Sequence, residues 1–153
     1  LWYVEQRQKR KNALEKKAIK NLPLKLNYAL LLYKNNLRTI IKICRSRNQN
    51  LILLTQPTMW RHYLPEKLRD LCWQHVDGNM AYTTDALEKL ERLYNRVLIK
   101  VCEEEKISYI DIASILPKDE SVFYDDCHFN IAGCESLANI LTDYIAKKMA
   151  QKN

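Results

Sequence analysis

Residues 50–57, with the sequence NLILLTQP, decide the fold class of this chain. The apolar run at residues 51–54 is short and nearly unbroken, and Pro57 ends it. A strand without alternating polar residues needs cover on both faces, which is typical of an inner strand of a parallel sheet. We therefore predict a buried strand here.

Amphipathic helices are predicted on both sides of this strand, because apolar residues recur at steps of three and four. The first helix covers residues 24–47, and the second begins near Thr84, which we expect to be its cap. The first apolar stripe is Leu26, Leu30, Tyr33, Leu37, Ile40, Ile41 and Cys44. The second stripe is Leu87, Leu90, Leu93, Val97, Leu98 and Val101.

A second strand and a last helix complete the pattern. The strand is expected within residues 107–116 (ISYIDIASIL), and Asn130 is expected to cap the helix. The alternation of helices and strands predicts an α/β fold with a doubly wound parallel sheet. The apolar stripe of the last helix is Ile131, Cys134, Leu137, Leu141, Ile145 and Met149.

A long aromatic-rich connection joins the first strand to the second helix. It predicts a short helix near residues 66–75 and a role as a binding loop or lid. Its aromatic side chains either line an acyl or sugar pocket or cover the sheet edge, and the sequence favours neither. The aromatic residues are Trp60, Tyr63, Trp73 and Tyr82, and His62 and His75 of the same connection are expected at the surface.

Composition excludes several classes of protein. The 153 residues, 47% of them hydrophobic, fit a single domain, residues 1–153. Two glycines are too few for a phosphate loop, a dinucleotide fingerprint or a Gly-x-Ser-x-Gly elbow. No apolar run approaches the roughly 18 residues of a membrane span, so we expect a soluble protein without a membrane span.

The five cysteines are widely spaced and form no Cys-x-x-Cys pair. This argues against a disulfide framework and a structural zinc site, and we expect mostly buried free thiols, which favour a cytoplasmic location. The net charge of +7 is concentrated in the segment EQRQKRKNALEKKAIK, within a basic helical lead-in at residues 1–23. We expect a solvated helix there, and no nucleic acid partner. The chain starts at Leu1, and the localisation signal, if any, is not visible.

The segment YDDCHFNIAG, residues 124–133, contains the strongest candidate site. It follows the second strand, and sites in α/β sheets form beyond the carboxyl ends of the strands. Asp125 precedes His128 by three residues, so its carboxylate can fold back, fix the imidazole tautomer and leave the other ring nitrogen as a base. Asp-x-x-His alone is a weak signal, because short motifs occur by chance. Asp111, at the strand end, is expected to be a turn or cap residue.

Taken with its context, YDDCHFNIAG resembles the C-terminal signature of the SGNH (GDSL-type) hydrolases. The helix and strand ending in TQP, and LERLYNRVLIKVCEEEKISYIDIASILP, are similar to the segments that precede this signature in the family. The resemblance covers about residues 24–150. It implies a three-layer, flavodoxin-like fold with His128 as general base and Asp125 as the carboxylate that orients it.

The N-terminal motifs of that family, Gly-Asp-Ser and Gly-x-Asn-Asp, do not occur in this sequence. The resemblance therefore implies the C-terminal part of a serine esterase, a domain incomplete at its N-terminus, whose nucleophile and oxyanion donors lie outside the chain. It implies small-molecule or carbohydrate esters as substrates, and no cofactor. We also expect self-association through an unpaired strand edge.

Two alternatives remain. The first is a non-catalytic interaction module that uses the basic N-terminal helix, which strong salt dependence of binding would reveal. The second is a metal site formed by Asp125, Asp126, His128 and either Cys127 or Cys134. We expect no metal, because neighbouring residues do not all point at one ion.

Overall fold

The computed structural model describes residues 4–5, 8–9, 12, 18–19, 22, 25–72 and 81–151. Trp73, His75 and most of the basic lead-in lie outside the described residues. The elements are β1 (Ala18–Ile19), α2 (Leu26–Ser46), β2 (Ile52–Leu54), α3 (Glu66–Arg69), β3 (Ala81–Tyr82), α4 (Thr84–Glu105), β4 (Ser108–Ile110), α5 (Ile112–Ile115) and α6 (Ile131–Ala150).

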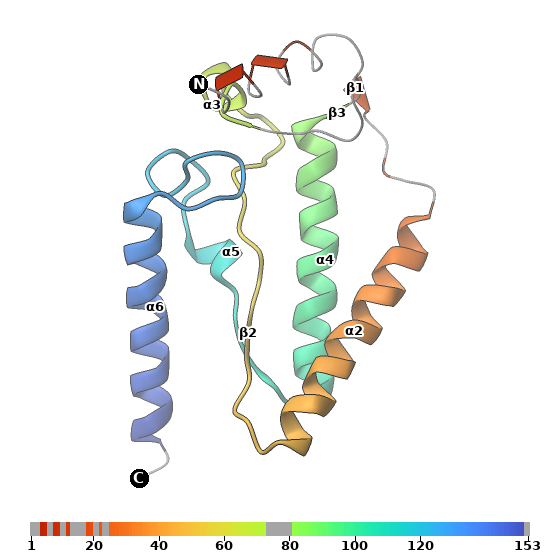
Figure 1. Cartoon of the computed structure of the whole chain (residues 1–153), viewed down its shortest axis with the longest axis vertical. Coiled ribbons are helices and arrows are strands. Elements are labelled where there is room, and N and C mark those ends of the chain that lie inside the picture. Colours follow the sequence, from red (N-terminus) through yellow and green to blue (C-terminus); the bar gives the residue numbers. More distant parts are fainter. Residues whose placement is uncertain are drawn as a thin grey trace.

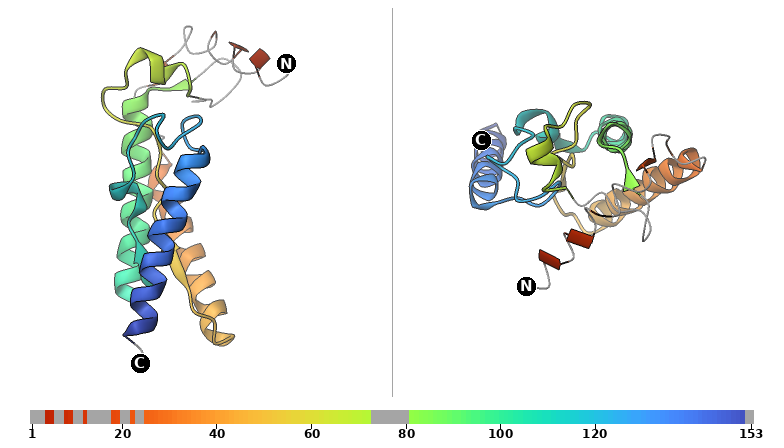
Figure 2. Two further views of the ribbon diagram at one scale, coloured as in Figure 1. Left: turned by 90° about the vertical axis from the view of Figure 1, so that its left-hand side faces the viewer. Right: turned by 90° about the horizontal axis from the view of Figure 1, so that it is seen from above.

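The two central strands, β2 and β4, are parallel and lie between layers of helices (Figure 1). Ile52 is paired with Ser108 and Leu54 with Ile110. Helices α2 and α4 lie on one side of the strands and α6 on the other, as Figure 1 and the view from above in Figure 2 show. The protein is therefore of mixed α/β type and mostly helical.

The α2–α4 layer forms because the apolar stripes of both helices face one another and the strands. Leu37 and Ile41 of α2 are buried against Leu98, Val101 and Cys102 of α4. Ion pairs join the two helices at the acidic C-terminal end of α4. Arg38 lies 2.8 Å from the carboxylate of Glu104, and Arg45 lies 2.8 Å from that of Glu105. Both predicted helices are confirmed.

Several boundaries differ from the sequence prediction. The N-cap of α4 is Thr83, whose side chain accepts a hydrogen bond from the Ala86 backbone, and not Thr84. The second strand ends at Ile110, because Asp111 turns the chain into the short helix α5. The short helix near residue 66 is only α3, and Ala18–Ile19 forms a parallel strand with β3 where a helix was expected.

Strand β2 is paired on one edge only in the described part of the chain, and it is half-buried where full burial is predicted. Among the described strands it pairs only with β4, so its other edge carries no described strand. The flavodoxin-like sheet of the resemblance therefore stays a prediction.

Helix α6 leaves most of its predicted apolar stripe in solvent. Ile131 is 81% and Met149 66% exposed, and Gly133 is the buried residue of the helix. The predicted helix and its cap are confirmed, but no described element covers the exposed residues of the stripe.

The structure also bears on the predicted state of the cysteines and on the prediction that no segment spans a membrane. Cys72 and Cys102 are buried, Cys44 and Cys127 half-buried and Cys134 exposed, and all five are free. The prediction that most are buried is therefore wrong, whereas the expected absence of disulfides holds. No helix among the described residues has the length and apolar character needed to cross a membrane.

Candidate functional site

The loop that carries Asp125 and His128 is held against the start of α6. The backbone N–H of Tyr124 donates to the His128 carbonyl at 2.8 Å, and Phe123 bridges and stacks on Phe129. Asn130 caps α6 by accepting from the Gly133 backbone at 2.8 Å, as the sequence predicts. The loop is thus closed by its own hydrogen bonds.

Gly133 is required by this closure. A Cβ atom at this position would lie 2.1 Å from the Val122 carbonyl oxygen, which accepts a hydrogen bond from the backbone of Asn130. Such a distance is far below ordinary van der Waals contact, and the obstructing atom is backbone. The glycine therefore permits the close approach of the loop to the helix.

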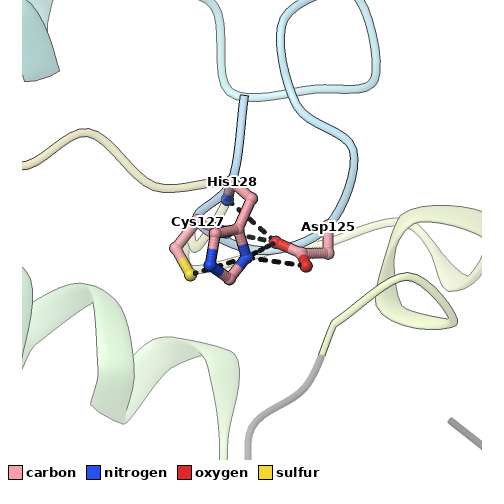
Figure 3. A group of neighbouring side chains, drawn as sticks. All are labelled: Asp125, Cys127 and His128. Carbon is pink, nitrogen blue, oxygen red and sulfur yellow. Dashed lines mark hydrogen bonds and ion pairs between the residues drawn. The ribbon is translucent and has the colours of Figure 1, made fainter. Parts of the chain in front are cut away.

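Asp125 is buried and holds both the loop and the His128 ring (Figure 3). One carboxylate oxygen accepts from the backbone N–H groups of Cys127 and His128, at 3.0 and 2.8 Å. The other lies 2.9 Å from Nδ1 of His128. Burial raises the pKa of Asp125, but the two backbone N–H groups and the imidazole outweigh it, so the pKa is lower than usual.

The His128 side chain is 75% exposed, although Asp125 contacts its Nδ1 atom. Asp125 occupies Nδ1, which fixes the proton there and leaves Nε2 as the acceptor. The predicted contact between Asp125 and the imidazole is confirmed. The catalytic roles of the two residues stay predictions.

Asp126 points away from the ring and into the protein. Its carboxylate accepts from the Trp60 indole at 3.1 Å, and its carbonyl accepts from the Met59 backbone at 2.9 Å. The adjacent residues Asp125 and Asp126 therefore have different partners. Asp125 contacts the His128 ring, and Asp126 joins the site loop to the segment that follows β2.

The segment after β2 is fixed by side chains that sequence reasoning did not select. Asn95 of α4 exchanges two hydrogen bonds of 2.8 Å with the backbone of Gln56. Glu91, also buried, accepts from the Thr58 hydroxyl at 2.6 Å and pairs with Lys118 at 3.1 Å. Burial raises the pKa of Glu91, and Thr58 and Lys118 oppose this. The sequence offers one signal for Glu91 and Asn95: their positions place them on the same face of α4 as the buried residues Leu87 and Leu98.

Asp111 lies at the N-terminus of α5, as expected, but does not cap that helix with its side chain. It accepts instead from the Thr55 hydroxyl at 2.8 Å, and Thr55 in turn accepts from the Ala113 backbone at 3.0 Å. Thr55 thus ties the end of β2 to the turn after β4.

The Cys127 thiol lies beside the imidazole, with its Sγ atom 3.6 Å from Nδ1 of His128 (Figure 3). Burial, Asp126 and Asp125 raise the pKa of the thiol to about 12. We therefore do not expect Cys127 to act as a nucleophile, because the thiolate is the reactive form.

Of the other predicted residues, Trp60 supports the site loop, and none contacts the His128 ring in a bond that the structure shows among the described residues. His62 is an 87% exposed surface histidine, as expected, and is paired with Asp85 at 2.7 Å. Tyr63 is 78% exposed, whereas Trp60 packs on the apolar cluster beneath the site loop. Tyr82 is half-buried in β3.

No model of a protein family, no curated protein and no solved structure matches this chain.

Proposed function

We propose that this chain supplies the catalytic Asp125–His128 pair of a serine acyl hydrolase of the SGNH type, acting on esters of small molecules or carbohydrates. One observation carries the proposal: a buried carboxylate lies 2.9 Å from Nδ1 of an imidazole that is otherwise exposed. The pair follows two parallel strands, at the end where α/β enzymes carry their sites.

In this mechanism Nε2 of His128 takes the proton of a serine hydroxyl as the hydroxyl attacks the ester carbonyl. The resulting imidazolium then donates that proton to the leaving alcohol. Asp125 stabilises the imidazolium and keeps the ring in the productive tautomer, which its hydrogen bonds to the loop backbone already prepare.

The nucleophilic serine is proposed to come from outside these residues. Four serine hydroxyls of the chain are bonded locally, to backbone carbonyls or to Asp119. The uncovered edge of β2 and the exposed stripe of α6 are surfaces on which further elements of such a domain would pack. The four serines are Ser46, Ser114, Ser121 and Ser136.

The test is p-nitrophenyl acetate hydrolysis by the whole gene product, with a chelator present. We expect His128→Ala to reduce kcat by roughly 10⁶-fold and Asp125→Asn by roughly 10⁴-fold, because the base survives in the second variant. His62→Ala is the matched control, since His62 is also exposed and paired with an aspartate. Equal, mild losses in both His variants would refute the proposal.

A further inference from the structure

Three metal-binding side chains converge on one point of the site loop. One ligand atom each of Asp125, Cys127 and His128 lies within 4.8 Å of the other two. Nδ1 of His128 is 2.9 Å from the carboxylate and 3.6 Å from the sulfur, and Figure 3 shows both groups beside the ring.

These separations are close to those of a tetrahedral zinc site. With Zn–N and Zn–O bonds of about 2.0–2.2 Å and a Zn–S bond of about 2.3 Å, nitrogen and oxygen lie about 3.3 Å apart and nitrogen and sulfur about 3.6 Å. The sulfur and the carboxylate are at most 4.8 Å apart, so the Cys127 side chain closes by no more than about 1 Å on binding.

The local charge also favours a cation. Asp125 is a buried member of the cluster, and Asp126, also buried, is next to it in the chain. A divalent cation at the cluster offsets this negative charge and binds the sulfur directly.

We propose that Asp125, Cys127 and His128 bind a zinc ion through one carboxylate oxygen, the sulfur and Nδ1. A thiolate and an imidazole select a borderline-soft metal and disfavour Mg²⁺ or Ca²⁺, which take oxygen ligands. Solvent reaches the ring, so a water completes the four ligands.

Binding at Nδ1 moves the imidazole proton to Nε2 and displaces the thiol proton to solvent. One proton is therefore released for each zinc ion, and affinity rises with pH. The ring then has no lone pair left with which to act as a base. This last consequence rests on the proposed function: zinc binding and ester hydrolysis exclude each other.

The test uses Co²⁺ as the spectroscopic probe of the purified chain. We expect near-ultraviolet absorption from sulfur-to-cobalt charge transfer, which Zn²⁺ abolishes by competition. Cys127→Ser should lose this band and His128→Gln should weaken Co²⁺ binding at least about tenfold. Cys134→Ser is the matched control and should keep the band, because Cys134 is an exposed thiol on α6.

Absence of the band, or a band that survives in Cys127→Ser, would overturn the zinc site. Proton release is measured on the same samples by titration in buffers of different ionisation enthalpy, and a value near zero would also contradict it. Neither readout depends on turnover. Failure of the zinc site is therefore distinguishable from failure of the hydrolase proposal, which is assayed with a chelator.

Discussion

Replacing Lys118 by methionine should destabilise the protein through Glu91. The Lys118 ammonium lies 3.1 Å from the buried Glu91 carboxylate and 3.2 Å from the Trp60 carbonyl, and its side chain is 25% exposed. Removing one partner of a buried pair costs about 3–5 kcal/mol, because the other charge stays buried without compensation. The partial exposure of Lys118 and the hydrogen bond from Thr58 to Glu91 reduce this to about 2–3 kcal/mol.

The loss should depend on pH. Burial already holds the pKa of Glu91 above its usual value, and Lys118 opposes that shift, so Lys118→Met raises the pKa further. A carboxyl group with a raised pKa in the folded state favours folding at low pH and disfavours it as the pH rises through that pKa. We therefore expect the full destabilisation at about pH 7.5 and a much smaller one at about pH 5.

Urea denaturation followed by circular dichroism measures both values. Lys67→Met is the matched control, because it breaks the Lys67–Glu120 pair, whose side chains are 80% and 45% exposed. The control should change stability little at either pH, since exposed ion pairs are screened by water and salt. A loss for Lys118→Met that equals the control, or that does not change with pH, would refute the buried-pair argument.

Two further experiments have definite expected outcomes, one on the Gly133→Ala variant and one on the chain alone. Gly133→Ala gains about 1 kcal/mol of helix propensity but drives a Cβ into the Val122 carbonyl, so we expect a net loss of about 1–2 kcal/mol in urea denaturation, and a gain would contradict the close contact. The 153-residue chain alone should hydrolyse p-nitrophenyl acetate no faster than its His128→Ala variant, because the proposal places the nucleophile and the oxyanion donors outside these residues and a base cannot replace them. A rate equal to that of the whole gene product would place the nucleophile within the chain.

The parts of the fold that the sequence predicts correctly depend on local patterns. Helices α2 and α4 follow from the periodicity of their apolar residues, and the pairing of β2 with β4 from two short apolar runs. The Asp125–His128 contact was predictable because it spans three residues and is made by the loop itself. Asn130 was recognisable as a cap for the same reason.

The contacts that the sequence does not reveal join distant segments. Glu91 and Asn95 are polar and are not part of the predicted apolar stripe, yet they lie on the buried face of α4 beside Leu87 and Leu98. Their partners, Thr58, Lys118 and Gln56, come from segments far away in the sequence, which periodicity does not show. The exposed stripe of α6 is the converse case: the period is correct, but burial depends on another element.

The buried supports explain how the site keeps its geometry although its ring is exposed. Asp126 receives hydrogen bonds from Met59 and Trp60, and Lys118 holds the Trp60 carbonyl against Glu91. Helix α4 therefore holds the segment after β2 in place, and that segment in turn holds the site loop. His128 is 75% exposed, so an attacking hydroxyl or a competing zinc ion can approach it from solvent. The proposed hydrolase pair and the proposed zinc site therefore depend on the same supports, and Lys118→Met should weaken ester hydrolysis and zinc binding in proportion to the loss of folded protein.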